Sequence, residues 1–347
     1  MTFEDVTLND GYKMPAIAYG TGSKWKGKSV VEYVQTAIDV GFSHLDTAQF
    51  YQTEEDVGQA IRESGLARDE FFVTTKYSGG VPVQVAFKNS LQKLGLKHVD
   101  LYLIHNPRII GDKLLPHVWQ QLEKFRWDGT ARYVCSIPYT IYTLITRTLS
   151  SRSIGVSNFE VEHFKTIFSV ARIIPAVNQI HLHPYNYAES KPVLDFCASH
   201  KIVVEAYSSL DPITKYPGGP VDAPLAAAAA KRNATSVQAL FLWVRAKGVV
   251  IVTTSSTRSH MEEYLAISEL EPLTAEEVAA IDEAGAKGPP ALTWSRRARA
   301  QITTRNAIAA VVLVLMLLQL FFRMSFLRGT LSVLLTYFSQ AHIFAVL

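Results

Sequence analysis

Short apolar runs alternate with segments of helical periodicity along most of the chain. In Ser29–Val40 the apolar residues recur at the spacing of one helix face, whereas Val99–Ile104 is a mostly apolar run typical of a buried strand. Strict alternation of the two favours parallel βα units. Before the first unit, Phe3–Met14 alternates around Asn9-Asp10-Gly11, which predicts a β-hairpin.

The pattern predicts eight strands in succession. They are expected to end near Tyr19, Asp46, Lys76, His105, Val156, Ile180, Ala206 and Thr253. A closed barrel and a doubly wound open sheet both contain such units. The doubly wound sheet is expected to carry GxGxxG after its first strand, but only Gly20-Thr21-Gly22 is found there. We therefore favour a (β/α)8 TIM barrel, with the hairpin closing its N-terminal end.

Polar side chains stand at or just after the ends of the second, third and fourth strands, at Asp46, Tyr51, Lys76 and His105. In a parallel barrel the C-terminal ends of the strands meet on one face, where active sites lie. Each residue alone has an ordinary explanation, such as a helix cap, packing, surface charge or a core histidine. Together they predict one catalytic cluster.

Six motifs, HLDTAQFY, TTK, LYLIH, GVSNF, VNQIHLHP and VEAYSSL, follow one another along the chain. In this order, and at roughly this spacing, they resemble the aldo-keto reductases from about Val6 to Gly288. Lys24–Gly27 and the later Val-Thr-Thr-Ser-Ser resemble the fungal members in particular. The resemblance implies an NAD(P)H-dependent oxidoreductase that reduces aldehyde or ketone carbonyls to alcohols.

By this resemblance Tyr51 is the proton donor, and Asp46, Lys76 and His105 support it. A tyrosine with a pKa near 10 is a weak acid at neutral pH, so we expect the positive charge of Lys76 to lower that pKa. Asp46 would hold the ammonium, and His105 would contact the substrate carbonyl. The alternative is a non-catalytic, cofactor-binding regulatory subunit of the same fold, tethered to a membrane partner.

The resemblance also implies the cofactor contacts. The nicotinamide is expected against Ser157, Asn158, Gln179 and Tyr207, with Tyr207 stacked on the ring. The phosphates are expected near Ser208, Leu210, Ser255 and Arg258. NADPH is favoured over NADH because Ser255 and Arg258 offer a hydroxyl and a guanidinium to a ribose phosphate.

Two differences from the family's usual pattern concern specificity. Where many members carry Lys-Ser and then Arg, this chain has Thr254-Ser255 and then His260. Asn106 replaces the aromatic residue that commonly follows the histidine, so Asn106 and Trp25 are the predicted substrate-pocket residues. Loop packing is the alternative role for Trp25.

A segment of twenty residues, Tyr133–Arg152, interrupts the pattern before the fifth strand. It contains no Gly, Ala, Asn, Asp, Glu or Lys, unlike a solvent-exposed loop, and connections in such folds are usually short. Its deletion would join Gly-Thr-Ala-Arg132 directly to Ser153-Ile-Gly-Val. Two explanations stay open, a short intron read in frame and a genuine insertion, and we predict that the barrel does not need the segment.

Composition narrows the class of protein. Two cysteines, Cys135 and Cys197, without a CxxC motif or a His/Cys cluster, favour a reducing compartment and no structural zinc. The N-terminus has no basic-then-apolar leader. The net charge of +3 arises from the end of the chain, because residues 291–347 contain six arginines and no acidic residue. We expect a monomeric barrel at residues 1–290 that binds no nucleic acid.

The last part of the sequence predicts a membrane anchor. A basic linker, 291–306, precedes a hydrophobic tail, 307–347, in which the sixteen residues 307–322 contain one polar side chain, Gln319. A helix of this length spans about 24 Å, slightly less than a bilayer core of about 30 Å. The positive flank predicts a barrel on the cytosolic face, possibly of the endoplasmic reticulum. A second span at 331–347, or a cytoplasmic enzyme without an anchor, is the alternative.

Overall fold

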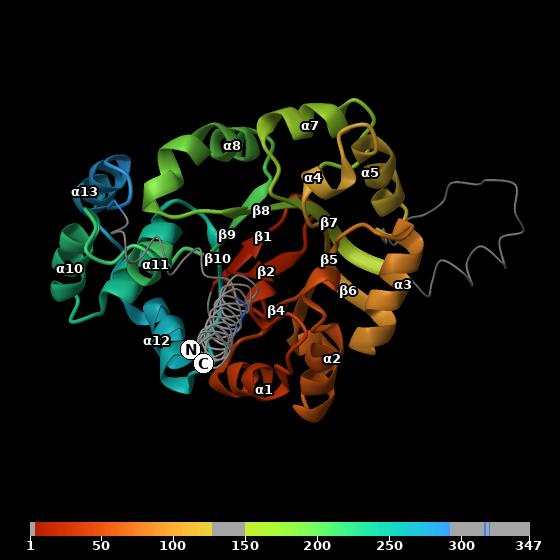
Figure 1. Cartoon of the computed structure of the whole chain (residues 1–347), viewed down its shortest axis with the longest axis horizontal. Helices are drawn as coiled ribbons and strands as arrows, with labels where there is room; N and C mark the ends of the chain where they lie inside the picture. The colour runs from red at the N-terminus through yellow and green to blue at the C-terminus, as the bar shows by residue number, and fades with distance from the viewer. Residues whose placement is uncertain (1–3, 127–149, 292–315, 317–318, 320–347) are drawn as a thin grey trace, which may run out of the picture. The chain divides into compact units, whose positions relative to one another are not determined.

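The computed structural model describes residues 4–126, 150–291, 316 and 319 (Figure 1). The chain divides into two compact units, Met1–Pro290 and Ala291–Leu347. Of the second unit only Ala291, Met316 and Gln319 are described, so the predicted span 307–322, the segment 331–347 and the linker lie otherwise outside the described residues. No helix in the described part of the chain is long and apolar enough to cross a bilayer.

Eight parallel strands close into a barrel at the centre of Figure 1, in the order β10-β3-β4-β5-β6-β7-β8-β9. This confirms the predicted barrel. The strands are β3 Ile17–Gly20, β4 His44–Asp46, β5 Phe72–Tyr77, β6 His98–Ile104, β7 Ser150–Ser157, β8 Val177–His181, β9 Val203–Tyr207 and β10 Val250–Thr253.

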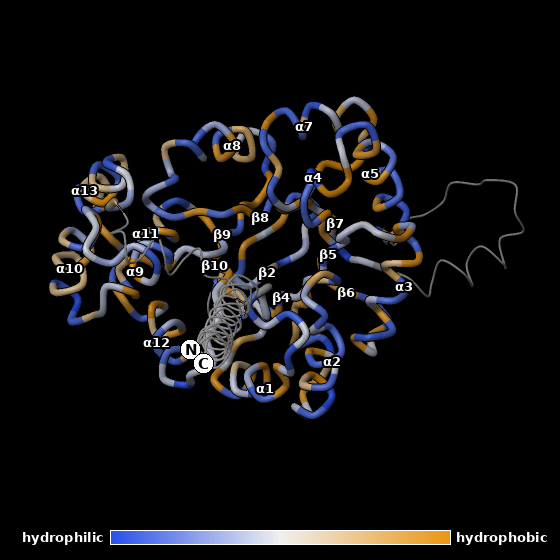
Figure 2. The backbone as a smooth tube through the Cα atoms, viewed as in Figure 1, coloured by the Kyte–Doolittle hydropathy of each residue, from blue (hydrophilic) through white to orange (hydrophobic). Residues whose placement is uncertain are grey.

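Helices surround the barrel, and hydrophobic and hydrophilic residues alternate along them in Figure 2. The α-helices are α1 Val31–Val40, α2 Glu54–Glu63, α3 Val83–Leu94, α4 Pro107–Ile110, α5 Leu115–Glu123, α7 Val161–Phe168, α8 Tyr187–Ser199, α9 Asp211–Thr214, α10 Asp222–Ala230, α11 Ser236–Ala246, α12 Arg258–Leu265 and α13 Ala275–Ala286. Short 3-10 turns are η1 Ser23–Trp25, η2 Gln49–Tyr51, η3 Arg68–Glu70, η4 Pro184–Asn186 and η5 Ala266–Glu269.

Local sequence sets the helix ends. α1 ends at Gly41, whose φ of 114° is easily adopted only by glycine. Before α13, the Thr274 hydroxyl accepts from the Glu277 amide and the Glu277 carboxylate accepts from the Thr274 amide. This is the capping box that a threonine followed three residues later by a glutamate indicates in the sequence.

The predicted hairpin is present as β1 Asp5–Thr7 and β2 Lys13–Pro15, with Val6 opposite Met14. Leu8 and Met14 are almost fully buried in one cluster with barrel side chains such as Leu101. Since the same cluster contains Phe72, Val177 and Val250, the first residues of β5, β8 and β10, the hairpin covers the N-terminal end of the barrel, as predicted.

The fifth barrel strand differs from the prediction. β7 begins at Ser150, so the last three residues of the predicted insert Tyr133–Arg152 belong to the barrel. The amide of buried Ser151 donates to the Phe125 carbonyl, and Arg152 Nη1 lies 2.8 Å from Asp100 Oδ1. The sequence did not reveal these strand residues because a serine- and arginine-rich stretch lacks the apolar pattern of a strand. That the barrel does not need Tyr133–Arg152 stays a prediction. Residues 133–149 lie outside the described residues.

Candidate active site

A buried ion pair joins the ends of β4 and β5. Lys76 Nζ donates to Asp46 Oδ1 at 2.5 Å and to the Thr47 carbonyl at 3.0 Å. Lys76 is 0% exposed and Asp46 is 2% exposed. Burial alone lowers the pKa of Lys76, but the charges of Asp46 and Tyr51 outweigh it, so that the pKa lies above its usual value. The ammonium is therefore permanently charged beneath the site.

Tyr51 lies on η2, directly after β4, and meets His105 from the end of β6. Tyr51 Oη lies 3.4 Å from His105 Nε2, and Lys76 Nζ lies 5.1 Å from the centroid of the Tyr51 ring. Burial raises the pKa of Tyr51, and Lys76 offsets only part of that effect. The Lys76 charge thus acts in the expected direction on the pKa of Tyr51, but the cost of desolvating a phenolate is larger, so the net pKa lies above its usual value.

His105 is held by Ser78, whose Oγ lies 2.8 Å from His105 Nδ1. Burial and the nearby Lys76 charge lower the pKa of His105 to about 4, so the ring is neutral at pH 7. A neutral imidazole has one donor and one acceptor nitrogen. The Ser78 hydroxyl can accept a hydrogen bond from Nδ1 or donate one to it, depending on which nitrogen carries the proton. The Nε2 atom next to Tyr51 is thus available for a hydrogen bond with a carbonyl or a phenol.

Gln179, in the middle of β8, connects the ion pair to a second carboxylate. Its Nε2 donates to Asp46 Oδ2 at 2.9 Å and to Glu205 Oε2 at 2.8 Å. Glu205 is 0% exposed, and burial followed by the Asp46 charge raises its pKa to about 7. Glu205 was not among the predicted site residues. Its position could have indicated a role, because a carboxylate inside the mostly apolar strand Val203–Tyr207 is unusual.

The predicted nicotinamide residues lie together beside this cluster. Ser157 Oγ donates to the Gln179 carbonyl, and Asn158 Nδ2 donates to the His105 carbonyl at 3.0 Å. Tyr207 Oη donates to Asn158 Oδ1 at 2.8 Å. Asn158 has a φ of 61°, a left-handed conformation that asparagine tolerates better than most residues. The wall of Ser157, Asn158, Gln179 and Tyr207 is thus one hydrogen-bonded unit.

The predicted phosphate residues are more open. Ser208, with a φ of 57°, accepts the Asp211 amide at its carbonyl, and Leu210 precedes α9. Ser255 Oγ accepts the Thr257 amide at 3.0 Å and lies 3.5 Å from His260 Nδ1. These side chains line the loops after β9 and β10.

Arg258 is engaged elsewhere. Its Nε lies 2.8 Å from Glu262 Oε1, one turn later on α12, and both side chains are more than half exposed. An exposed pair of this kind contributes little stability and is easily exchanged for another anion.

The two predicted pocket residues have structural partners. Trp25 packs on Tyr33 with ring centroids 4.9 Å apart, and Asn106 Oδ1 accepts the Arg108 amide as the N-cap of α4. Both residues nevertheless stay near the catalytic side chains. Asn106 directly follows His105, and the loop of Trp25 is joined to Tyr51 because the Gly27 amide donates to the Tyr51 carbonyl. These contacts are compatible with a place in a substrate pocket.

The sequence pattern of the aldo/keto reductase family matches residues 16–138 and 150–216. This chain belongs to the aldo/keto reductase family. The match omits 139–149, which lies within the predicted insert and is shorter than it. The match also ends before Ser255 and Arg258, so it does not cover the predicted ribose phosphate site.

Relatives with assigned activities cover most of this aldo/keto reductase. It is 34% identical over 265 residues to an NAD/NADP-dependent indole-3-acetaldehyde reductase of Schizosaccharomyces pombe, covering 74% of this chain and 86% of the relative. It is 32% identical over 313 residues to an NADPH-dependent alpha-keto amide reductase of Saccharomyces cerevisiae, covering 84% and 94%. The crystal structure of a Bombyx mori aldo-keto reductase in complex with NADP has a TM-score of 0.63 at 32% identity, covering 82% of this chain and 93% of that one.

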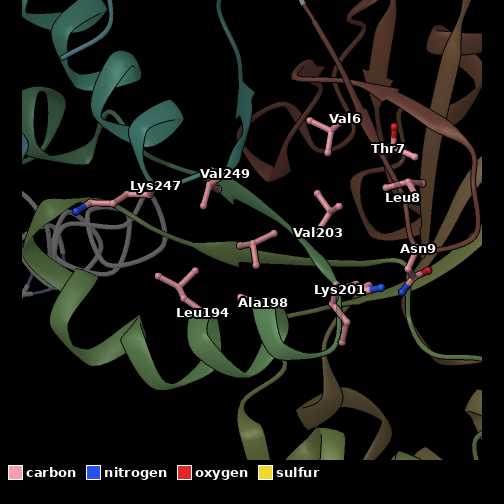
Figure 3. A pocket seen from close by; sticks show the side chains of 13 residues that line it. Val6, Thr7, Leu8, Asn9, Leu194, Ala198, Lys201, Val203, Lys247 and Val249 are labelled. Atoms are coloured by element: carbon pink, nitrogen blue, oxygen red, sulfur yellow. The ribbon is translucent and has the colours of Figure 1, made fainter. Parts of the chain in front are cut away.

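A separate pocket lies at the opposite end of the barrel (Figure 3). It is lined by hairpin residues Val6 and Leu8, by Val203 at the start of β9, and by Lys201 and Lys247. The N-terminal strand ends around it are remote from Asp46 and Lys76, so this pocket is not the candidate active site.

Proposed function

We propose that this aldo/keto reductase reduces an aldehyde or ketone to an alcohol with NADPH, and that Tyr51 is the proton donor. The observation that carries the proposal is the placement of Tyr51 Oη beside His105 Nε2 and above the Lys76–Asp46 pair. The four side chains come from three consecutive βα units and lie at the barrel face where this fold carries its chemistry.

The groups have complementary tasks in the reduction. NADPH supplies the hydride that is transferred to the carbonyl carbon. The carbonyl oxygen gains negative charge as this happens, and the Tyr51 hydroxyl transfers its proton to that oxygen. The raised pKa of Tyr51 keeps this proton in place at neutral pH. Lys76 stabilises the phenolate that remains, and neutral His105 orients the carbonyl.

The residues present fit a nicotinamide. In the described part of the chain Gln179 Oε1 accepts no hydrogen bond, whereas both hydrogens of its Nε2 are used by Asp46 and Glu205. A carboxamide NH₂ can therefore donate to Gln179 Oε1. Its oxygen can accept from Ser157 or Asn158 only in exchange for one of the bonds that these donors make to the Gln179 carbonyl, the His105 carbonyl and Ser157 Oγ. Tyr207 offers its ring as the adjacent stacking surface.

NADPH is proposed over NADH on the charge near the ribose phosphate site. His260 Nδ1 lies 3.5 Å from the Ser255 hydroxyl. Arg258 begins α12 in the same segment, and a phosphate can replace Glu262 as its partner. The NADPH-dependent relative of Saccharomyces cerevisiae and the NADP complex of the Bombyx mori enzyme support this cofactor, whereas the Schizosaccharomyces pombe relative is NAD/NADP-dependent.

The test is NADPH oxidation by the full chain with a panel of aldehydes, ketones and α-keto amides. We expect turnover of at least one class, and a larger kcat/KM with NADPH than with NADH. Tight NADPH binding without turnover of any carbonyl would favour the regulatory-subunit alternative. A second variant, Ser78→Ala, keeps Tyr51 but removes the hydrogen bond that holds the His105 ring. Its KM for the carbonyl is expected to be higher than that of the parent.

The membrane anchor at 307–322 stays a prediction that rests on sequence alone. Carbonate extraction of the full chain from membranes tests it, with a chain ending at Pro290 as the comparison. Equal release of both chains into the soluble fraction would contradict the anchor.

A further inference from the structure

A second cluster of polar side chains lies next to the candidate active site. His181 ends β8, His183 follows two residues later, and Asp211 begins α9 in the loop after β9. Their potential ligand atoms all lie within 4.8 Å of one another. We propose that His181, His183 and Asp211 form a binding site for a divalent transition metal such as Zn²⁺.

The spacing of the two histidines suits this chemistry. Residues two apart in extended backbone project to the same side, so the sequence His-Leu-His presents two imidazoles together. Zinc binds imidazole nitrogens and carboxylate oxygens at about 2.0–2.2 Å, which places tetrahedral ligand atoms about 3.3 Å apart. His181 Nε2 and Asp211 Oδ2 are already 3.1 Å apart. His183, whose ligand nitrogen lies within 4.8 Å of both, would complete the three ligands by moving closer, and a fourth position would be left for water.

His183 is buried and has a ring nitrogen available for a ligand bond. It is 5% exposed, and its Nδ1 has no hydrogen-bond partner among the described residues. Asn186 fixes the backbone around the pair, because its Oδ1 accepts the His183 amide and its Nδ2 donates to the His181 carbonyl.

The Lys215 ammonium would compete with a metal ion for the Asp211 carboxylate. Its ammonium lies 2.8 Å from Asp211 Oδ2, the same oxygen that faces His181, and its side chain is 60% exposed. A metal ion that binds Asp211 has to displace this ammonium or move it to the other carboxylate oxygen. Removal of the lysine charge should therefore strengthen metal binding.

The site adjoins the predicted nicotinamide wall. The His181 ring stacks on Tyr207 with centroids 5.5 Å apart and an interplanar angle of 21°. Asp211 follows the loop that carries Ser208 and Leu210. A bound metal would tie the end of β8 to this loop.

The experiment is a titration of the tag-free, metal-free full chain with Co²⁺, followed by the visible bands of the bound ion, and with Zn²⁺ by calorimetry. We expect one equivalent to bind. His181→Gln and Asp211→Asn should each weaken binding at least about tenfold, whereas His117→Gln, at an exposed histidine on α5, should leave it unchanged. Circular dichroism of each variant separates loss of ligands from loss of fold.

Lys215→Met provides the opposite signature, since it should tighten binding of both ions. This result is not expected if the cluster is only a structural ion pair. The proposal is overturned if the parent chain binds no stoichiometric ion, if His181→Gln binds as tightly as the parent, or if Lys215→Met does not tighten binding. None of these readouts depends on reductase activity.

Discussion

The two ends of the predicted cofactor site are built differently. At the catalytic end Lys76, Asp46, Gln179 and Glu205 are at most 2% exposed and are joined by hydrogen bonds between strands far apart in sequence. At the ribose phosphate end, the side chain of Arg258 is more than half exposed, and its partner lies only four residues away.

This contrast follows from what each end has to do. Charge develops at the carbonyl during reduction, and donors and charges stabilise it best when they are already in place and shielded from water. Recognition of a phosphate needs only that flexible cations reach it after binding. Substitutions at the first end should therefore change stability and kcat, and substitutions at the second should change cofactor affinity alone.

The largest effect is expected from Lys76→Met. It leaves the buried Asp46 carboxylate without its cation, and breaking a buried pair on one side costs about 3–5 kcal/mol. Urea unfolding should show this loss together with loss of turnover. Lys165→Met is the matched control, since its pair with Glu162 is exposed and should contribute less than about 1 kcal/mol. Equal losses of unfolding free energy in the two variants would contradict the distinction between buried and exposed ion pairs.

Glu205→Gln should change how stability depends on pH. Folding raises the pKa of Glu205 from 4.5 to about 7, so its favourable contribution is complete below about pH 4.5 and is lost as the pH rises through about 7. Relative to the glutamine variant, the parent should lose up to about 3 kcal/mol of unfolding free energy between about pH 5 and pH 8. Parallel pH profiles for the two proteins would show that Glu205 has an ordinary pKa.

Arg258→Ala should weaken NADPH binding by about tenfold, which corresponds to about 1.4 kcal/mol. NADH affinity, kcat and stability should stay the same, because the exposed pair with Glu262 contributes little to the fold. Fluorescence titration with both nucleotides measures this. An equal effect on NADH would mean that Arg258 does not contact the ribose phosphate.

The smallest effect is expected from deletion of Tyr133–Arg152. Arg132 would then precede Ser153 and take the place of Arg152 opposite Asp100. Thermal unfolding and turnover should match the full-length chain. The same deletion with Arg132→Ala should be the less stable of the two, and a deletion variant that fails to fold would show that the segment is a structural element.

The sequence allowed correct prediction of features that depend on local pattern. The hairpin, the eight strands and the capping box at Thr274 follow from alternation and spacing, and motif order brought Asp46, Tyr51, Lys76 and His105 together. Features that depend on distant partners were missed. Glu205 gains its raised pKa from burial beside Asp46. β7 starts at Ser150, which pairs with His98 of β6, and Arg152 meets Asp100 across the same two strands. Neither contact leaves a periodic signal in the sequence.

The most direct test of the account is a single-turnover measurement on Tyr51→Phe. The NADPH complex is mixed with a carbonyl substrate, and nucleotide oxidation is followed in time. We predict that the variant binds NADPH as tightly as the parent but reacts about 10²- to 10⁴-fold more slowly, because it has lost only the proton donor. Oxidation of NADPH at the parental rate would contradict the assignment of Tyr51.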